Sequence, residues 1–139
     1  MISQIYFRFN SSEKVIKLET FVKVIQKELL GFDHEVRESS NYYSGFYHSF
    51  KTKENKINVA EADDIFFYDY HYVISFYKEE KNLQAKIMKL AEFWVNKGCT
   101  VSIPDGPSIG SLVRTCFLDE NESIAWKTHI QHEPESREN

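Results

Sequence analysis

Apolar and polar residues alternate at the start of the chain. The apolar series is Ile5, Phe7 and Phe9, and the polar series is Gln4, Tyr6 and Arg8. A two-residue period places the two series on opposite faces of an extended segment. This stretch therefore predicts a half-buried β-strand.

The period then changes to that of a helix. Spacings of three and four residues separate Val15, Leu18, Val22, Ile25 and Leu29. These positions form one apolar stripe and predict an amphipathic helix. The spacing of Asn10 and Glu13 resembles a capping box, which places the start of the helix just after Asn10. Gly31 is suited to end the helix, because glycine adopts the left-handed conformation without strain.

Residues 32–77 lack helical periodicity, and turn-forming residues divide them into short runs of high β propensity. The predicted strands lie at 34–38, at 42–50, around 57–59 and at 65–77. In the longest run, alternation places Tyr68, Tyr70 and Tyr72 on one face and Asp69 and His71 on the other. We favour packing of the tyrosine face beneath the helices, and an interface is the alternative because each tyrosine carries a hydroxyl that needs a partner.

A second helix is predicted around Leu83, Ile87, Leu90 and Trp94, with Gly98 at its end. The strands predicted after it lie at 99–103, 112–118 and 124–130. Residues 132–139 are acidic and contain no large apolar side chain. We therefore expect one domain, 1–131, followed by an acidic disordered tail, 132–139.

Two helices in a chain otherwise rich in strands indicate an α+β fold. We expect both helices to pack on one face of a mostly antiparallel sheet. The order of elements is also compatible with a ferredoxin-like arrangement that carries added hairpins. A chain of 139 residues is long enough to build one hydrophobic core of this kind.

The formal net charge is −4, and aromatic residues make up 15% of the chain. This charge balance argues against direct binding to nucleic acid or to an anionic membrane, since both require clustered cations. The sequence shows no signal peptide and no apolar run near the roughly 18 residues that span a bilayer, so we expect a cytoplasmic location. Cys99 and Cys116 are expected to be reduced, buried thiols.

The sequence contains no motif of a known catalytic site. Asp69 and His71 lie two residues apart in a predicted strand and could act as an acid and base pair. A polar pair on a solvated sheet face is the more ordinary explanation of that spacing. The alternative function is accordingly a small enzyme or ligand-binding domain that uses Asp69 and His71 in a pocket between the sheet and the helices. We expect no cofactor and no bound metal.

Acidic residues and tyrosines are concentrated in the same part of the chain. Glu61, Asp63, Asp64 and Asp69 lie between residues 61 and 69, where no basic residue occurs. Tyr42, Tyr43 and Tyr47 lie in a turn-rich segment just before them, and His71 lies just after them. Tyrosine is enriched at the energetic centres of protein interfaces. These eight residues predict a binding surface with an aromatic centre and an acidic rim.

Such a surface is suited to a stoichiometric inhibitor of a basic protein. Nucleases have basic clefts because their substrates are polyanions, and carboxylates can replace phosphates there. Bacterial immunity proteins, which neutralise toxins, have this size and surface character, so we expect a function of this class. A module in which the tyrosine-rich strand pairs with a second copy is a further possibility, and the oligomeric state is left open.

Overall fold

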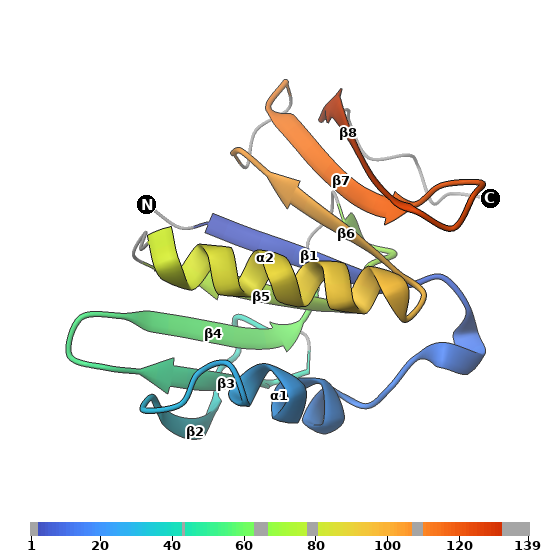
Figure 1. The fold of residues 1–139 in the computed structure, drawn as a ribbon. Helices are drawn as coiled ribbons and strands as arrows, with labels where there is room; N and C mark the ends of the chain where they lie inside the picture. The colour runs from blue at the N-terminus through green and yellow to red at the C-terminus, as the bar shows by residue number, and fades with distance from the viewer. Residues whose placement is uncertain (1–2, 43, 63–66, 78–80, 107–109, 132–139) are drawn as a thin grey trace.

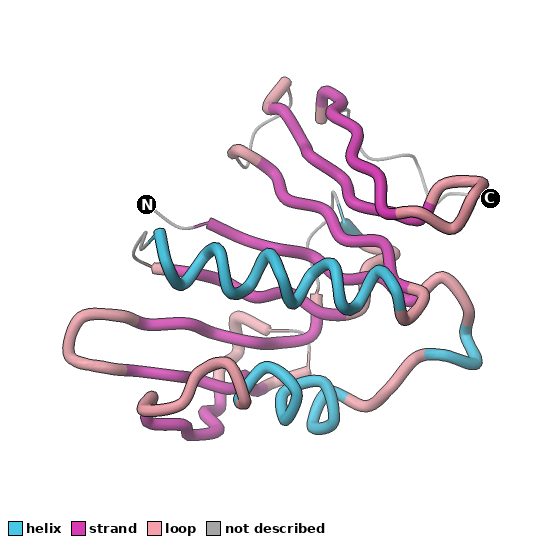
Figure 2. Tube along the Cα trace, in the orientation of Figure 1, coloured by secondary structure: helices cyan, strands magenta, loops and turns pink. Residues whose placement is uncertain are grey.

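The computed structural model describes residues 3–42, 44–62, 67–77, 81–106 and 110–131. Within these residues, eight strands form one antiparallel sheet and two α-helices pack against it. The strands are β1 Ser3–Phe9, β2 Asp33–Glu38, β3 Phe46–Lys51, β4 Lys56–Glu61, β5 Tyr72–Phe76, β6 Cys99–Pro104, β7 Leu112–Leu118 and β8 Ile124–Ile130. The helices are α1 Leu18–Gln26, α2 Lys81–Asn96 and the short 3₁₀ helix η1 Ser12–Lys14. The α+β class is confirmed (Figures 1 and 2).

The strand order is β2-β3-β4-β5-β1-β6-β7-β8. Strands that follow one another in the chain are neighbours in the sheet, except at β1, which lies between β5 and β6. The chain reaches β2 at one edge through α1, and α2 connects β5 to β6 across β1 (Figure 1). All seven pairings of the described strands are antiparallel. β5 and β6 run parallel on either side of β1 and are joined by α2, which is a split β-α-β arrangement, so the order β4-β5-β1-β6 is compatible with the ferredoxin-like alternative.

Both helices lie on the same face of the sheet, which we call the helix face (Figure 1). Phe21 of α1 is fully buried and joins the layers: its ring centroid lies 5.0 Å from Phe7 of β1, 4.9 Å from Tyr72 of β5 and 5.1 Å from Trp94 of α2. The predicted core positions Leu18, Val22, Ile25 and Leu29 are also buried. Leu18, Val22 and Ile25 of the predicted stripe therefore form the packing surface of α1, whereas Leu29 is buried after the helix and Val15, before it, is 37% exposed.

The opposite face, which we call the open face, is formed by the alternate residues of the same strands. Tyr6 of β1 lies between Val73 of β5 and Ser102 of β6 in the register, and Ser102 pairs with Thr115 of β7. A small apolar cluster forms around Tyr6, whose ring stacks on Phe67 at 4.1 Å. The positions around this cluster are mostly small and polar. In the central strands, alternation thus directs one side to the apolar core and the other to the more polar open face.

The predicted start of the first helix is wrong. α1 begins at Leu18, and the residues before it form η1 and an extended segment without a side-chain cap. The side chain of Asn10 is used elsewhere: its Oδ1 accepts hydrogen bonds from Thr100 Oγ1 at 2.9 Å and from Arg8 Nε at 3.4 Å. The backbone N–H of Asn10 also donates to Gly98. Contacts with the distant strand β6 therefore replace the local capping interaction.

The strand predicted over 65–77 is also too long, because β5 contains only Tyr72–Phe76. Of the preceding residues, 67–71 form a turn that is closed by the N–H of Tyr70 donating to Phe67, and residues 65 and 66 lie outside the described part. The three tyrosines consequently lie in different environments. Tyr72 is buried on the helix face, Tyr70 is half-buried on the open face, and Tyr68 is 44% exposed.

The other predicted elements agree more closely with the structure. The strands at 112–118 and 124–130 are confirmed, and β2, β4 and β6 extend their predicted ranges by a few residues. β3 begins at Phe46 instead of 42, because the connection from β2 is closed by the N–H of Ser39 donating to Gly45, just before the strand. The tail predicted at 132–139 lies outside the described residues. No helix in the described part is both long and apolar enough to cross a membrane.

Candidate functional site

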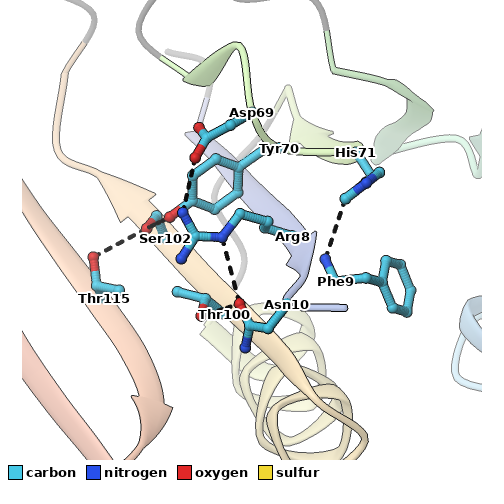
Figure 3. A network of polar contacts seen from close by, with 9 residues as sticks. All are labelled: Arg8, Phe9, Asn10, Asp69, Tyr70, His71, Thr100, Ser102 and Thr115. Carbon is cyan, nitrogen blue, oxygen red and sulfur yellow. Dashed lines mark hydrogen bonds and ion pairs between the residues drawn. The ribbon is translucent and has the colours of Figure 1, made fainter. Parts of the chain in front are cut away.

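A network of polar contacts lies on the open face around Arg8 (Figure 3). Arg8 Nη1 forms an ion pair with Asp69 Oδ2 at 2.8 Å, and Arg8 Nε donates to Asn10 Oδ1. The guanidinium carbon lies 5.2 Å from the centroid of the Tyr70 ring. Strand β1 and the turn before β5 therefore hold the guanidinium group in place from three directions.

A chain of hydroxyl groups runs from Tyr70 across the sheet. The oxygen of Tyr70 lies 2.6 Å from Ser102 Oγ, which lies 3.0 Å from Thr115 Oγ1 (Figure 3). Thr115 Oγ1 is in turn 3.3 Å from Nε2 of His129 in β8. Ser102 and Thr115 are only 1% and 4% exposed, so their hydroxyls are satisfied by one another and by these neighbours. Burial raises the pKa of Tyr70, which keeps the phenol protonated.

This network borders a pocket of about 400 Å³. The polar side chains that line it include Arg8, Tyr70, Thr100, Thr115, Lys127 and His129. They come from β1, β6, β7, β8 and the turn before β5, all on the open face. The pocket therefore does not lie between the sheet and the helices, where the sequence analysis had placed its alternative site.

The structure gives Asp69 and His71 different partners. Asp69 lies in the turn before β5 and pairs with Arg8. Nδ1 of His71 accepts a hydrogen bond from the backbone N–H of Phe9 at 3.2 Å (Figure 3). Burial, and then the positive charge of Arg8, lower the pKa of His71, so the neutral ring that accepts this bond is favoured. Because residues 67–71 are a turn, these two side chains do not share a strand face.

Tyr42 and Tyr47 are brought together on the open face near β2 and β3, away from the pocket around Arg8. Their ring centroids are 5.0 Å apart, and both side chains are half-buried. Burial raises the pKa of the Tyr42 hydroxyl. Tyr43 lies outside the described residues.

Glu61 lies on the opposite side of the sheet from this tyrosine pair. It ends β4 in the same phase as the core residues Ile57 and Val59, and it lines a pocket of about 330 Å³ with Tyr72 and Glu19. Burial, followed by the charge of Glu61, raises the pKa of Tyr72 to about 12. Asp63 and Asp64 are outside the described residues. The predicted acidic residues that are described, Glu61 and Asp69, thus lie on different faces.

A different set of carboxylates is exposed along the edge strand β2. All six residues of β2 are exposed, and its sequence Asp-His-Glu-Val-Arg-Glu contains three acids and one arginine. Arg37 Nη1 lies 3.1 Å from Glu35 Oε1 in a solvent-exposed ion pair. On the helix face, a shallow groove of about 660 Å³ lies between this strand and the 39–45 loop, with Val36, Glu38 and Phe46 among its walls. Sequence reasoning did not single out this strand, because its position at the edge depends on the sheet order.

The two cysteines and the His34–His48 pair have chemically reactive side chains, but their surroundings indicate structural roles. Burial raises the pKa of Cys99 to about 12 and that of Cys116 to about 11, so both thiols are protonated and poorly nucleophilic. Nε2 of His34 lies 2.9 Å from Nδ1 of His48, and the His34 ring stacks on Phe50. Within the described residues, no group of three or more His, Cys, Asp or Glu side chains could hold a metal ion.

The sequence analysis did not assign the residues around this pocket to a common site, although it named Asn10 and Tyr70 for other reasons. Arg8, Ser102, Thr115 and Lys127 each occupy the polar phase of an alternating strand, which is a signal for one sheet face. That signal does not show which strands are neighbours. The contacts between them required the order β5-β1-β6-β7-β8.

Comparisons with protein-family models, with curated proteins and with solved structures found no match to this chain.

Proposed function

We propose that this chain is a binding protein that inhibits a basic partner by forming a one-to-one complex. The proposed class is that of a bacterial immunity protein, acting in the cytoplasm on a toxin such as a nuclease. The single observation that carries the proposal is β2, an edge strand whose six residues are all exposed and carry three carboxylates. The surface that we assign to the partner comprises β2, the groove beside it and the Tyr42–Tyr47 pair, and we call it the β2 surface.

An exposed edge strand favours association because its outer backbone N–H and C=O groups have no neighbouring strand. An extended segment of a partner can add to such an edge, with backbone hydrogen bonds supplying affinity. The carboxylates of β2 attract a basic segment and oppose an acidic one. Strand addition and charge therefore favour the same kind of partner.

The groove beside β2 is suited to a lysine or arginine side chain. Val36 is 58% exposed and, with Phe46, provides an apolar wall for the methylene groups. Glu38 provides a carboxylate for the charged end. This combination distinguishes a basic side chain from a purely apolar one.

The tyrosine pair adds an aromatic contact on the open face of the same sheet edge, whereas the groove lies on the helix face, so the β2 surface extends around the edge. Tyr47 is paired in the register with Arg37 of β2, and its ring packs against Tyr42. Half-buried tyrosines lose little conformational freedom when a partner covers them, which favours a role as anchors. Glu61, Asp69 and His71, which the sequence analysis assigned to the partner surface, are not part of the β2 surface.

Titration calorimetry against the purified protein encoded by the adjacent reading frame, as the candidate basic partner, tests the proposal. We expect a one-to-one complex, and we expect Glu38→Lys to weaken it at least about tenfold. Glu120→Lys is the matched control, because it makes the same change of charge at an exposed residue of the turn between β7 and β8. The control is expected to bind like the unmodified protein. Absence of a complex, or equal effects of the two variants, would contradict the proposal.

A further inference from the structure

We propose that the pocket on β1, β6, β7 and β8 binds a small molecule through a phosphate group. This site lies on the open face toward the β8 edge of the sheet, opposite the β2 edge, and it does not rest on the proposed function. Its volume of about 400 Å³ falls within the range typical of small-molecule sites.

The charge of the pocket is opposite to that of the chain. Arg8 and Lys127 both line it, and none of the described lining residues is an aspartate or glutamate. The chain as a whole carries a formal net charge of −4. Two cations facing one cavity attract an anion, and a phosphate group carries close to two negative charges near neutral pH. The local charge therefore favours this ligand in spite of the acidic chain.

Asp69 positions Arg8 without closing the site. It contacts Nη1, and Asn10 contacts Nε, while the guanidinium group has five N–H donors in a planar arrangement. Asp69 itself is not among the lining residues. An arginine held in this way loses little side-chain entropy when it binds an oxyanion.

Lys127 provides the second cation from β8, which β6 and β7 separate from β1 in the sheet. Its Nζ lies 5.3 Å from the centroid of the Phe117 ring, which holds the exposed ammonium group over the pocket wall. The aromatic rings of Phe117 and Tyr70 both line the cavity. They offer flat surfaces for the remainder of the ligand, beyond its phosphate.

Hydroxyl groups complete the set of donors. Thr100 and Thr115 line the pocket, and both are at least nine-tenths buried. Thr115 belongs to the chain Tyr70–Ser102–Thr115–His129, in which each hydroxyl can donate or accept. Rotation of these hydroxyls can turn a donor toward a bound oxygen without moving the backbone. Arginine, lysine and hydroxyl donors together match the several acceptor oxygens of a phosphate better than a single carboxylate.

The amide NMR spectrum of the full chain, titrated with inorganic phosphate, provides the test. Sodium chloride at equal ionic strength is the reference for unspecific screening. We expect saturable shifts that are confined to residues around Arg8, Thr100, Thr115, Lys127 and His129. Arg8→Gln and Lys127→Gln are each expected to weaken the affinity for phosphate at least about tenfold, because each removes a charge-assisted contact.

Lys53→Gln is the matched control, since it removes one positive charge from an exposed residue of the β3–β4 turn. It is expected to leave phosphate affinity within about twofold of the unmodified protein. Lys127 is exposed, so its variant should retain the fold even if Arg8→Gln disturbs the turn at Asp69. An unchanged amide dispersion confirms that fold.

Three results would overturn the inference. The first is the absence of saturable shifts in phosphate, and the second is a loss of affinity in Lys53→Gln equal to that in Lys127→Gln. The third is tighter binding of a single-stranded oligonucleotide that shifts residues along the whole sheet, because this would indicate an extended polyanion site. If the chain forms no complex with a basic partner, these three binding measurements are unaffected.

Discussion

Thr115 and Cys116 are adjacent in β7, yet they lie in opposite environments. Cys116 is fully buried in the core on the helix face, where burial raises the pKa of its thiol to about 11. Thr115 is 4% exposed on the open face, where its hydroxyl contacts Ser102 and His129. Both side chains are shielded from water, but one is surrounded by apolar groups and the other by hydrogen-bonding partners.

The same contrast extends over the whole sheet. The helix face joins α1, α2 and the strands in one continuous apolar cluster. The open face has a smaller apolar cluster around Tyr6 and a set of buried polar side chains that includes Ser102 and Thr115. Apolar burial supplies most of the stability of a domain, whereas a satisfied polar network fixes positions at a small net gain. We therefore expect stability to depend mainly on the helix face and recognition to depend on the open face and on β2.

The largest expected effect is the loss of Phe21, which joins both helices to the sheet. Phe21→Ala should lower the free energy of unfolding by about 3 to 5 kcal/mol, because it removes a fully buried ring from between three aromatic neighbours. Phe67→Ala on the open face should cost about 2 kcal/mol, since the turn that carries Phe67 can close over the space. Urea denaturation measures both values. Equal losses would mean that the two faces contribute equally.

The adjacent pair in β7 sharpens the comparison at a single site. Cys116→Ser should destabilise the fold by about 1 to 3 kcal/mol, because it places a hydroxyl among apolar groups. Thr115→Val should cost about 1 kcal/mol or less, since Ser102 retains its contact with Tyr70. Thermal melting curves of the two variants show which substitution destabilises the fold more. If Thr115→Val were the more damaging change, the hydroxyl chain would be the stronger stabilising feature.

The pH dependence of stability reports on two histidines, His48 and His71. Burial is the main cause that lowers the pKa of His48, which faces His34 and Glu19, and of His71, which faces Arg8 and Asp69. A folded-state pKa below the ordinary value of about 6.5 means that the unfolded chain binds more protons as the pH falls. The contribution of both neutral rings is therefore present above about pH 6.5 and is lost progressively below it.

Urea denaturation at a series of pH values between neutral and mildly acidic measures this loss. We expect the unfolding midpoint to fall as the pH decreases, and we expect His48→Gln to reduce the dependence. A midpoint that rises on acidification would contradict the direction of both pKa shifts.

The smallest expected effect concerns the Arg8–Asp69 ion pair. Both side chains are substantially exposed, at 35% and 47%, so the coupling energy in a double-mutant cycle of Arg8→Gln and Asp69→Asn should be below about 1 kcal/mol. Arg8→Gln should nevertheless weaken phosphate binding at the pocket. A variant that loses affinity while keeping its stability would separate recognition from folding on the open face.

Local patterns predicted most of the elements but not all their limits. Alternation placed β7 and β8 correctly, and helical spacing identified the buried stripe of α1. The same rules failed at Asn10, whose side chain contacts β6, and at Phe67, whose ring packs on Tyr6. In both places the local sequence pattern is present, but a contact with a residue distant in the sequence determines the structure.

The candidate sites were less accessible to sequence reasoning than the fold was. Tyr42 and Tyr47 were predicted and do form a pair, but Glu61 and Asp69 lie on different faces. The polar residues of the pocket come from four strands and the turn before β5, whose proximity the sequence does not show. Clustering of acidic residues in the sequence could not predict clustering on the surface, because a turn at 67–71 changes the direction of the side chains.

By itself, the sequence determined which segments become strands and helices, because the period of apolar residues is set by the geometry of each local structure. It also determined which side of β1 faces the core and which side of α1 is buried. The tertiary structure alone decided that β2 lies at an edge and that Arg8, Thr115 and Lys127 face one pocket. Those arrangements depend on pairings between distant segments, which are fixed by the packing of the complete sheet.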